Sequence, residues 1–158
     1  MNKKVIIAIV AILVVLTVGV IGFLMLKEEP AKSLNIETAS NILANSVPFS
    51  EMATMYITSD LLEGVYGINP QNVANVAGKA PMMNVHASMY IILEAVDGQV
   101  DTVKTELEQY ATSYEQQWER YLPEQYELVQ NRKVGVVGNT VYMIVAENAE
   151  TLEQEITK

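Results

Sequence analysis

The sequence predicts an α+β domain that follows a single N-terminal transmembrane helix. Three observations lead to this prediction. The stretch from Val5 to Leu26 is apolar and carries no charge. Pairs of β-rich segments follow it, and amphipathic segments with apolar residues at helical spacing lie between and around them. Because helices and sheets each bury one apolar face, we expect a small antiparallel sheet of two hairpins, packed on one face by helices.

The apolar stretch has the length and the flanks of a membrane anchor. At about 1.5 Å per residue, Val5–Leu26 would extend roughly 33 Å as a helix, which matches a bilayer core of about 30 Å. Lys3 and Lys4 precede it, and Lys27 is followed by two glutamates. Since positively charged flanks stay in the cytoplasm, we expect a single-pass protein of the cell membrane, with a cytoplasmic N-terminus and an extracytoplasmic C-terminal domain.

The chain is therefore expected to have three parts: residues 1–27 as cytoplasmic tip and signal-anchor helix, 28–33 as linker, and 34–158 as the extracytoplasmic domain. A cleaved signal peptide is the alternative for the first part. The apolar region of a signal peptide normally has only about 7–15 residues. The nearest small-x-small site, Ala31-Lys32-Ser33, is separated from the apolar stretch by charged residues. Both features favour an uncleaved anchor.

Periodicity predicts the elements of the domain. Apolar residues recur three and four positions apart in the segments predicted as helices: Leu34–Val47, Asp60–Tyr66, Val100–Tyr121 and Asn148–Thr157, with one further turn at Glu124–Val129. Apolar alternation or β-rich composition predicts these strands: Val85–Val96, Val134–Val137 and Val141–Ala146. Gly138-Asn139 joins the last two as a tight hairpin. Val73–Ala80 fits a strand or a helix, and as a strand it completes the first hairpin.

Composition restricts the possible functions. Absence of cysteine excludes disulfides, thiolate catalysis and lipid attachment through cysteine. With 19 acidic and 10 basic residues, the chain has a formal net charge of −9, which repels nucleic-acid phosphates. The sequence contains no nucleotide-binding, zinc-protease or nucleophile-elbow motif. We therefore expect no nucleic-acid partner, no metal and no cofactor, and we favour a protein without enzymatic activity.

One face of the strand Val85–Val96 carries the candidate ligand-binding residues. His86 is the only histidine, and Ser88 and Tyr90 follow it at strand spacing. Neighbours in such a row lie about 7 Å apart, whereas a nucleophile and its base need about 3 Å. The row is therefore not a catalytic triad. It is either a solvent-facing strand surface or a ligand-binding face formed by His86, Ser88 and Tyr90.

Two other clusters have simpler structural explanations. Asp97 and Asp101 lie at the start of a predicted helix, where the helix dipole favours carboxylates, and their spacing does not fit a calcium-binding loop. An aromatic stripe follows the apolar seam of the longest predicted helix: Tyr110, Tyr114, Trp118 and Tyr121. Its spacing favours core packing, although a ligand platform is the alternative.

Three short motifs, in order along the chain, resemble those of an uncharacterised family. They are Val47-Pro48-Phe49, Tyr66-Gly67-Ile68-Asn69-Pro70 and Val137-Gly138-Asn139-Thr140-Val141. With the predicted order of elements, they make the chain similar to domain of unknown function 4358, a family of bacterial lipoproteins and membrane-anchored proteins, over about Leu34 to Ile156. The proline and the glycines of these motifs determine turns and helix ends.

This chain departs from the family pattern in two ways. It has no lipobox cysteine, so its anchor must be the helix, and the segment Pro81–Ser88 lacks the Gly/Ala-plus-acidic hairpin of the family. The family has no established activity, so the resemblance implies no functional residues. We expect a membrane-tethered extracytoplasmic interaction or accessory module, with another membrane or cell-envelope protein as a partner. A small-molecule or peptide-binding domain at the cell surface is the alternative.

Overall fold

The structure is a computed structural model, and it describes residues 33–158. The expected cytoplasmic tip, the transmembrane helix and all but the last residue of the linker lie outside this range, so those expectations stay predictions. Within residues 33–158, no helix combines the length and the apolar character needed to cross a bilayer.

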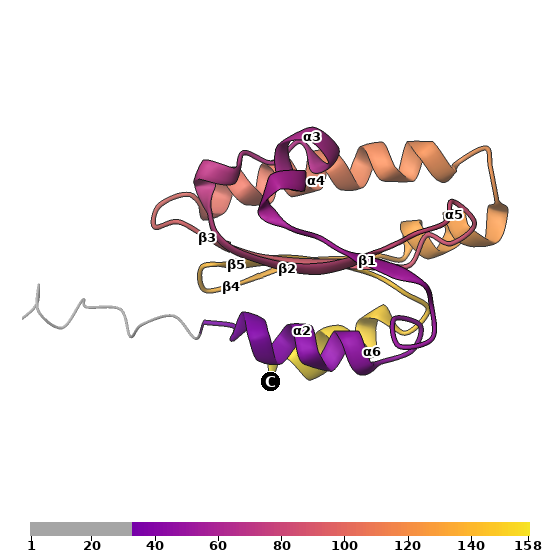
Figure 1. The fold of residues 1–158 in the computed structure, drawn as a ribbon, viewed down its shortest axis with the longest axis horizontal. Coiled ribbons are helices and arrows are strands. Elements are labelled where there is room, and N and C mark those ends of the chain that lie inside the picture. The colour runs from indigo at the N-terminus through magenta and orange to yellow at the C-terminus, as the bar shows by residue number, and fades with distance from the viewer. Residues whose placement is uncertain (1–32) are drawn as a thin grey trace, which may run out of the picture. The chain divides into compact units, whose positions relative to one another are not determined.

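An antiparallel sheet of five strands forms the centre of the described domain (Figure 1). The strands are β1 Thr54–Tyr56, β2 Val73–Pro81, β3 Met89–Ala95, β4 Lys133–Val137 and β5 Thr140–Val145. Their order across the sheet is β1-β2-β3-β5-β4, and every neighbouring pair is antiparallel. The α+β class and both predicted hairpins, β2–β3 and β4–β5, are confirmed. The ambiguous segment Val73–Ala80 is a strand, and β1 is an addition that the sequence did not predict.

Five α-helices occur at the predicted places along the described chain: α2 Ile36–Asn45, α3 Leu62–Tyr66, α4 Val100–Trp118, α5 Pro123–Gln130 and α6 Ala149–Thr157. Two short 3-10 helices, Ser59–Leu61 and Pro70–Asn72, precede α3 and β2. Local chemistry sets several ends. The Asn35 side chain accepts a hydrogen bond from the Thr38 amide at the start of α2. Gly67 ends α3 in the left-handed conformation with φ 65°, which glycine adopts without steric cost.

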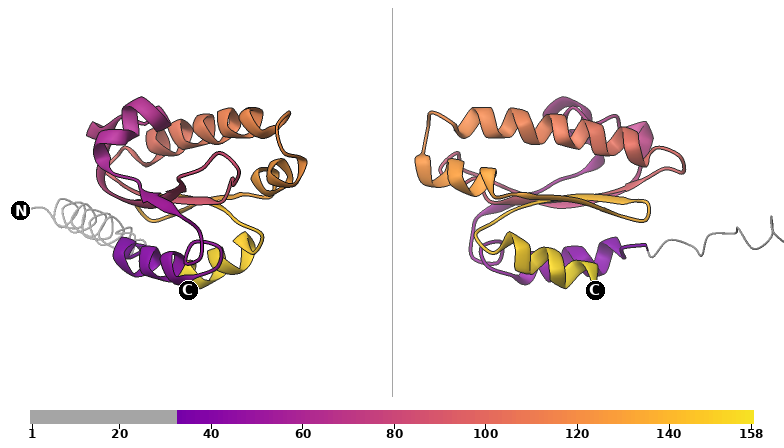
Figure 2. Two further views of the ribbon diagram at one scale, coloured as in Figure 1. Left: turned by 45° about the vertical axis from the view of Figure 1, so that its right-hand side comes forward. Right: turned by 180° about the vertical axis from the view of Figure 1, so that it is seen from behind.

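Helices cover both faces of the sheet, so the prediction of helices on one face is wrong. Helices α3, α4 and α5 lie on one face, and α2 and α6 lie side by side on the other (Figures 1 and 2). The physical reason is that central strands β3 and β5 are apolar on both faces. Ile91 packs into the first core, whereas Tyr90 and Ile92 pack into the second, with residues of α2 and α6.

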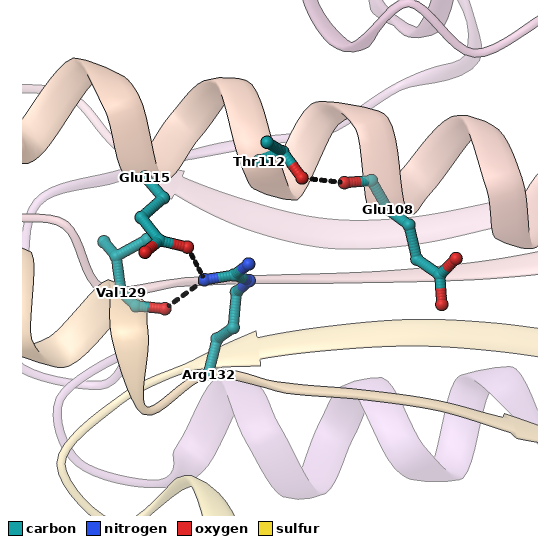
Figure 3. Close-up of polar contacts among 5 residues, drawn as sticks. All are labelled: Glu108, Thr112, Glu115, Val129 and Arg132. Atoms are coloured by element: carbon teal, nitrogen blue, oxygen red, sulfur yellow. Dashed lines mark hydrogen bonds and ion pairs between the residues drawn. The ribbon is translucent and has the colours of Figure 1, made fainter.

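An ion pair fixes α5 against α4 and β4. Arg132 directly precedes β4. Its guanidinium donates from Nη1 to Glu115 Oε2 on α4 at 2.7 Å and to the Val129 carbonyl oxygen on α5 at 2.8 Å (Figure 3). Nearby, the Thr112 hydroxyl donates to the Glu108 carbonyl oxygen, and this hydrogen bond joins two residues of α4 (Figure 3). Since Arg132 and Glu115 are both partly buried, their pairing holds α5 in place at one edge of the candidate site.

Candidate functional site

A groove of about 630 Å³ lies beside α5 and the segment that leads into β3. Four segments that are distant in sequence line it. They are the turn after α2 (Val47, Pro48, Glu51 and Met52), the segment before β3 (His86 and Ser88), α5 (Gln125 and Leu128) and the β5–α6 connection (Glu147 and Asn148). The groove therefore combines apolar, acidic and neutral polar side chains.

The structure brings two of the three predicted ligand-binding residues to this groove. His86 is exposed, Ser88 is only 6% exposed, and both line the groove. Tyr90 does not line it. Its side chain is 1% exposed and packs edge-on against Phe49, with its hydroxyl 3.3 Å from Ser40 Oγ on α2. The row is therefore not one solvent-facing strand surface, because α2 covers its Tyr90 end.

The segment that carries His86 and Ser88 precedes β3, which begins only at Met89, so the predicted start of this strand at Val85 is wrong. Two side chains hold Ala87, which is fully buried between them. The Ala87 amide donates to Gln125 Oε1 on α5 at 2.7 Å, and the Tyr114 hydroxyl on α4 donates to the Ala87 carbonyl oxygen at 3.1 Å. Because both backbone groups of Ala87 are bound to helices, the strand ladder ends here and its neighbours are held at the groove.

The opposite wall is the turn after α2. A cis peptide bond joins Val47 to Pro48, and the Met52 amide donates to the Pro48 carbonyl oxygen at 3.1 Å. The Phe49 side chain is 1% exposed and anchors the turn in the second core, where it packs with residues of α2, α6 and the sheet. Val47 remains 55% exposed at the edge of the groove. The turn thus presents apolar surface to the groove while Phe49 fixes its position.

The groove is negatively charged. Glu51 and Glu147 line it, are exposed, and form no ion pair with any described residue. Among residues 33–158, no lysine or arginine lines the groove. The Ser88 hydroxyl forms no hydrogen bond within residues 33–158, and the Asn148 side chain does not cap α6. These groups are available to a ligand with a positive charge and hydrogen-bonding groups.

Within residues 33–158, the groove does not contain the hydrogen bonds that join the members of a catalytic triad. No hydrogen bond joins His86 to Ser88 in the described part of the chain, and no carboxylate accepts one from the imidazole. A nucleophile, its base and an orienting group would need such contacts. Nor do residues 33–158 bring together three side chains from among histidine, aspartate and glutamate to hold a metal ion.

The aromatic stripe belongs mainly to the core, as its spacing predicted. Tyr114 and Trp118 are 8% and 3% exposed, and the rings from Tyr66 to Tyr121 form a chain of neighbouring contacts. Burial raises the pKa of Tyr114 to about 12. Tyr121, at 58% exposure, lies at the surface, where it lines with Trp118 a smaller hollow of about 350 Å³. In the described residues, Trp118 Nε1 is the one side-chain nitrogen or oxygen atom that is itself inaccessible to solvent and has no hydrogen bond.

The comparisons with known proteins support the family resemblance. A family model described as "Domain of unknown function (DUF4358)" matches residues 47–146, which include the turn after α2, the whole sheet and all three motifs. No curated protein and no solved structure matches the chain. Since the family model covers well over half of the sequence, the chain belongs to the family described as domain of unknown function DUF4358.

Proposed function

We propose that this chain is a non-enzymatic binding module, tethered at the outer face of the cytoplasmic membrane by its N-terminal segment. Its groove binds a short segment of a partner protein in which a basic residue lies beside an apolar one. One observation carries this proposal: Glu51 and Glu147 line an otherwise apolar and neutral groove without an ion-pair partner among the described residues.

The composition of the groove favours a peptide segment with these properties. A lysine or arginine places its charged end near carboxylates while its aliphatic stem lies along apolar surface. Val47, Met52 and Leu128 supply that surface beside the two glutamates. The Ser88 hydroxyl and the Asn148 amide can hydrogen-bond to a peptide backbone. Acidic charge over the whole chain, −9 in total, also accelerates association with a basic partner.

Several exposed residues line the groove, which favours a peptide over an enclosed small molecule. Small-molecule pockets bury about 70–90% of the ligand surface. This groove is formed by four surface segments, and exposed residues such as Val47 and His86 lie at its border. An extended segment can occupy it while remaining part of a larger partner protein.

The tether is supported by sequence. Val5–Leu26 has the length of a bilayer-spanning helix, and Lys3 and Lys4 lie on the side that would remain cytoplasmic. Protease added to intact cells tests this part separately. We expect degradation of the domain that follows Ser33, and protection of that domain would contradict an extracytoplasmic location.

Binding is tested with the full chain in lipid nanodiscs and a fluorescein-labelled peptide of alternating lysine and leucine. The Glu51→Gln/Glu147→Gln variant loses both groove charges, each worth about 0.2–1 kcal/mol in an ion pair at an exposed position. We therefore expect its dissociation constant in fluorescence anisotropy to rise about 2- to 30-fold. A peptide of alternating glutamate and leucine should not bind.

A matched control separates the groove from the general charge of the chain. Glu63→Gln/Glu119→Gln removes the same charge from exposed positions on α3 and at the end of α4, neither of which lines the groove. This variant should bind the lysine–leucine peptide nearly as the wild type does. Equal weakening by both double variants would show non-specific attraction and would contradict the proposal.

A further inference from the structure

Two adjacent methionines are exposed in the β2–β3 connection. Met82 and Met83 are 67% and 56% exposed, although methionine is among the side chains most often buried. His86, the only histidine of the chain, follows three positions after Met83 and is also exposed. The connection therefore presents two thioethers and one imidazole to solvent, and neither thioether lines the groove described above.

Backbone contacts place the β2–β3 connection beside the segment that carries a third thioether, that of Met52. The His86 amide donates to the Met83 carbonyl oxygen at 3.5 Å, so the chain turns between them. The Met82 amide donates to the Ala53 carbonyl oxygen at 3.0 Å, which places the connection beside the residue that follows Met52. Met52 and His86 in turn line the same groove. Four potential metal ligands thus lie on two neighbouring segments.

Their chemistry selects the metal. Thioether sulfur is a soft ligand that favours Cu(I), and imidazole also binds copper, whereas Mg²⁺, Ca²⁺ and Mn²⁺ prefer oxygen ligands. The chain has no cysteine that could compete as a thiolate ligand. We propose that Met82, Met83 and His86, with Met52 beside them, form a Cu(I)-binding site.

Replacement of methionine by leucine distinguishes a metal site from an apolar contact surface. Leucine keeps the size and the apolar character of the side chain and removes only the sulfur. Met82→Leu/Met83→Leu therefore preserves a surface that contacts protein or lipid, while it removes two ligands for copper. Met55→Leu is the matched control, because Met55 is also exposed, at 43%, but lies on β1 and outside the cluster.

The experiment uses the full chain in nanodiscs, without oxygen, and measures competition for Cu(I) with the coloured bicinchoninate complex. We expect the wild type and Met55→Leu to remove one equivalent of Cu(I) from the indicator. Met82→Leu/Met83→Leu and His86→Ala should each bind Cu(I) at least about tenfold more weakly, a loss of about 1.4 kcal/mol. Wild-type protein that leaves the indicator loaded, or a double variant with wild-type affinity, would overturn the proposal.

This site and the peptide groove can fail independently. Met82→Leu/Met83→Leu should bind the lysine–leucine peptide as the wild type does, and Glu51→Gln/Glu147→Gln should keep its affinity for Cu(I). Loss of copper binding in the glutamate variant would assign the metal to carboxylate oxygens and would contradict a thioether site.

Discussion

The hydrogen bond from Tyr114 to Ala87 gives the sharpest prediction about the structure of the groove. Tyr114→Phe removes only the hydroxyl that donates to the Ala87 carbonyl oxygen at 3.1 Å. Ala87 is fully buried and Tyr114 is 8% exposed, so water cannot easily replace the lost donor. A buried polar group left without a partner costs about 1–3 kcal/mol. We therefore expect the free energy of unfolding to fall by that amount.

The loss can be measured by urea and thermal unfolding. Trp118 is the only tryptophan, and its ring lies 6.1 Å from that of Tyr114, so its fluorescence reports on this part of the core. For a domain of this size, 1 kcal/mol shifts the melting temperature by about 4 °C, and we expect a decrease of about 4–12 °C. The same variant should bind the lysine–leucine peptide more weakly, because Ala87 lies between His86 and Ser88.

Tyr121→Phe is the control for this measurement. Tyr121 is 58% exposed and its hydroxyl has no hydrogen-bond partner among the described residues, so its loss should change stability by less than about 0.5 kcal/mol. If Tyr114→Phe is as stable as Tyr121→Phe, the Ala87 segment is not held as described and the reasoning is refuted.

Two further predictions concern the core. Burial raises the pKa of Tyr66 and of Tyr114 from 10.0 to about 12. Above pH 10 the unfolded chain releases these two protons before the folded domain does. The free energy of unfolding, measured in urea, should therefore fall by about 1.4 kcal/mol per pH unit for each tyrosine, up to about pH 12. A free energy of unfolding that does not change over this range would contradict the burial of the two tyrosines. Gly78→Ala would place a Cβ 2.6 Å from the Tyr90 carbonyl oxygen, so we expect a loss of about 1–3 kcal/mol, whereas Gly64→Ala, with open space around it, should unfold at or above the wild-type urea midpoint.

The sequence predicted the α-helices and most strands of the described domain because their signals are local. Helical spacing identified α4, and Gly138-Asn139 identified the β4–β5 hairpin, in which Gly138 has φ 61°. β1 was not predicted, because three residues are too few for a recognisable alternation and its pairing with β2 is a long-range contact. The second helical layer was missed because Tyr90 and Ile92 share their strand face with polar residues, which made a buried face look mixed.

The candidate site could be predicted only in part. His86 drew attention as the only histidine, and Ser88 through its spacing from His86. Glu51 and Glu147 had no distinguishing signal, because single carboxylates in exposed turns are common. These residues are brought to one groove by the chain topology, which places the turn after α2 and the β5–α6 connection at the same end of the sheet. The local periodicity of a sequence does not predict contacts between residues that lie so far apart along the chain.

The central claim is that the groove binds a basic and apolar peptide segment, and methionine methyl NMR tests it most directly. The full chain is labelled with ¹³C-methyl methionine. Met52 lines the groove and reports on binding there, whereas Met55 on β1 does not line it and serves as the control. Addition of the lysine–leucine peptide should shift the Met52 methyl signal in proportion to the bound fraction and leave that of Met55 unchanged. A bound peptide that leaves the Met52 signal in place would contradict the account.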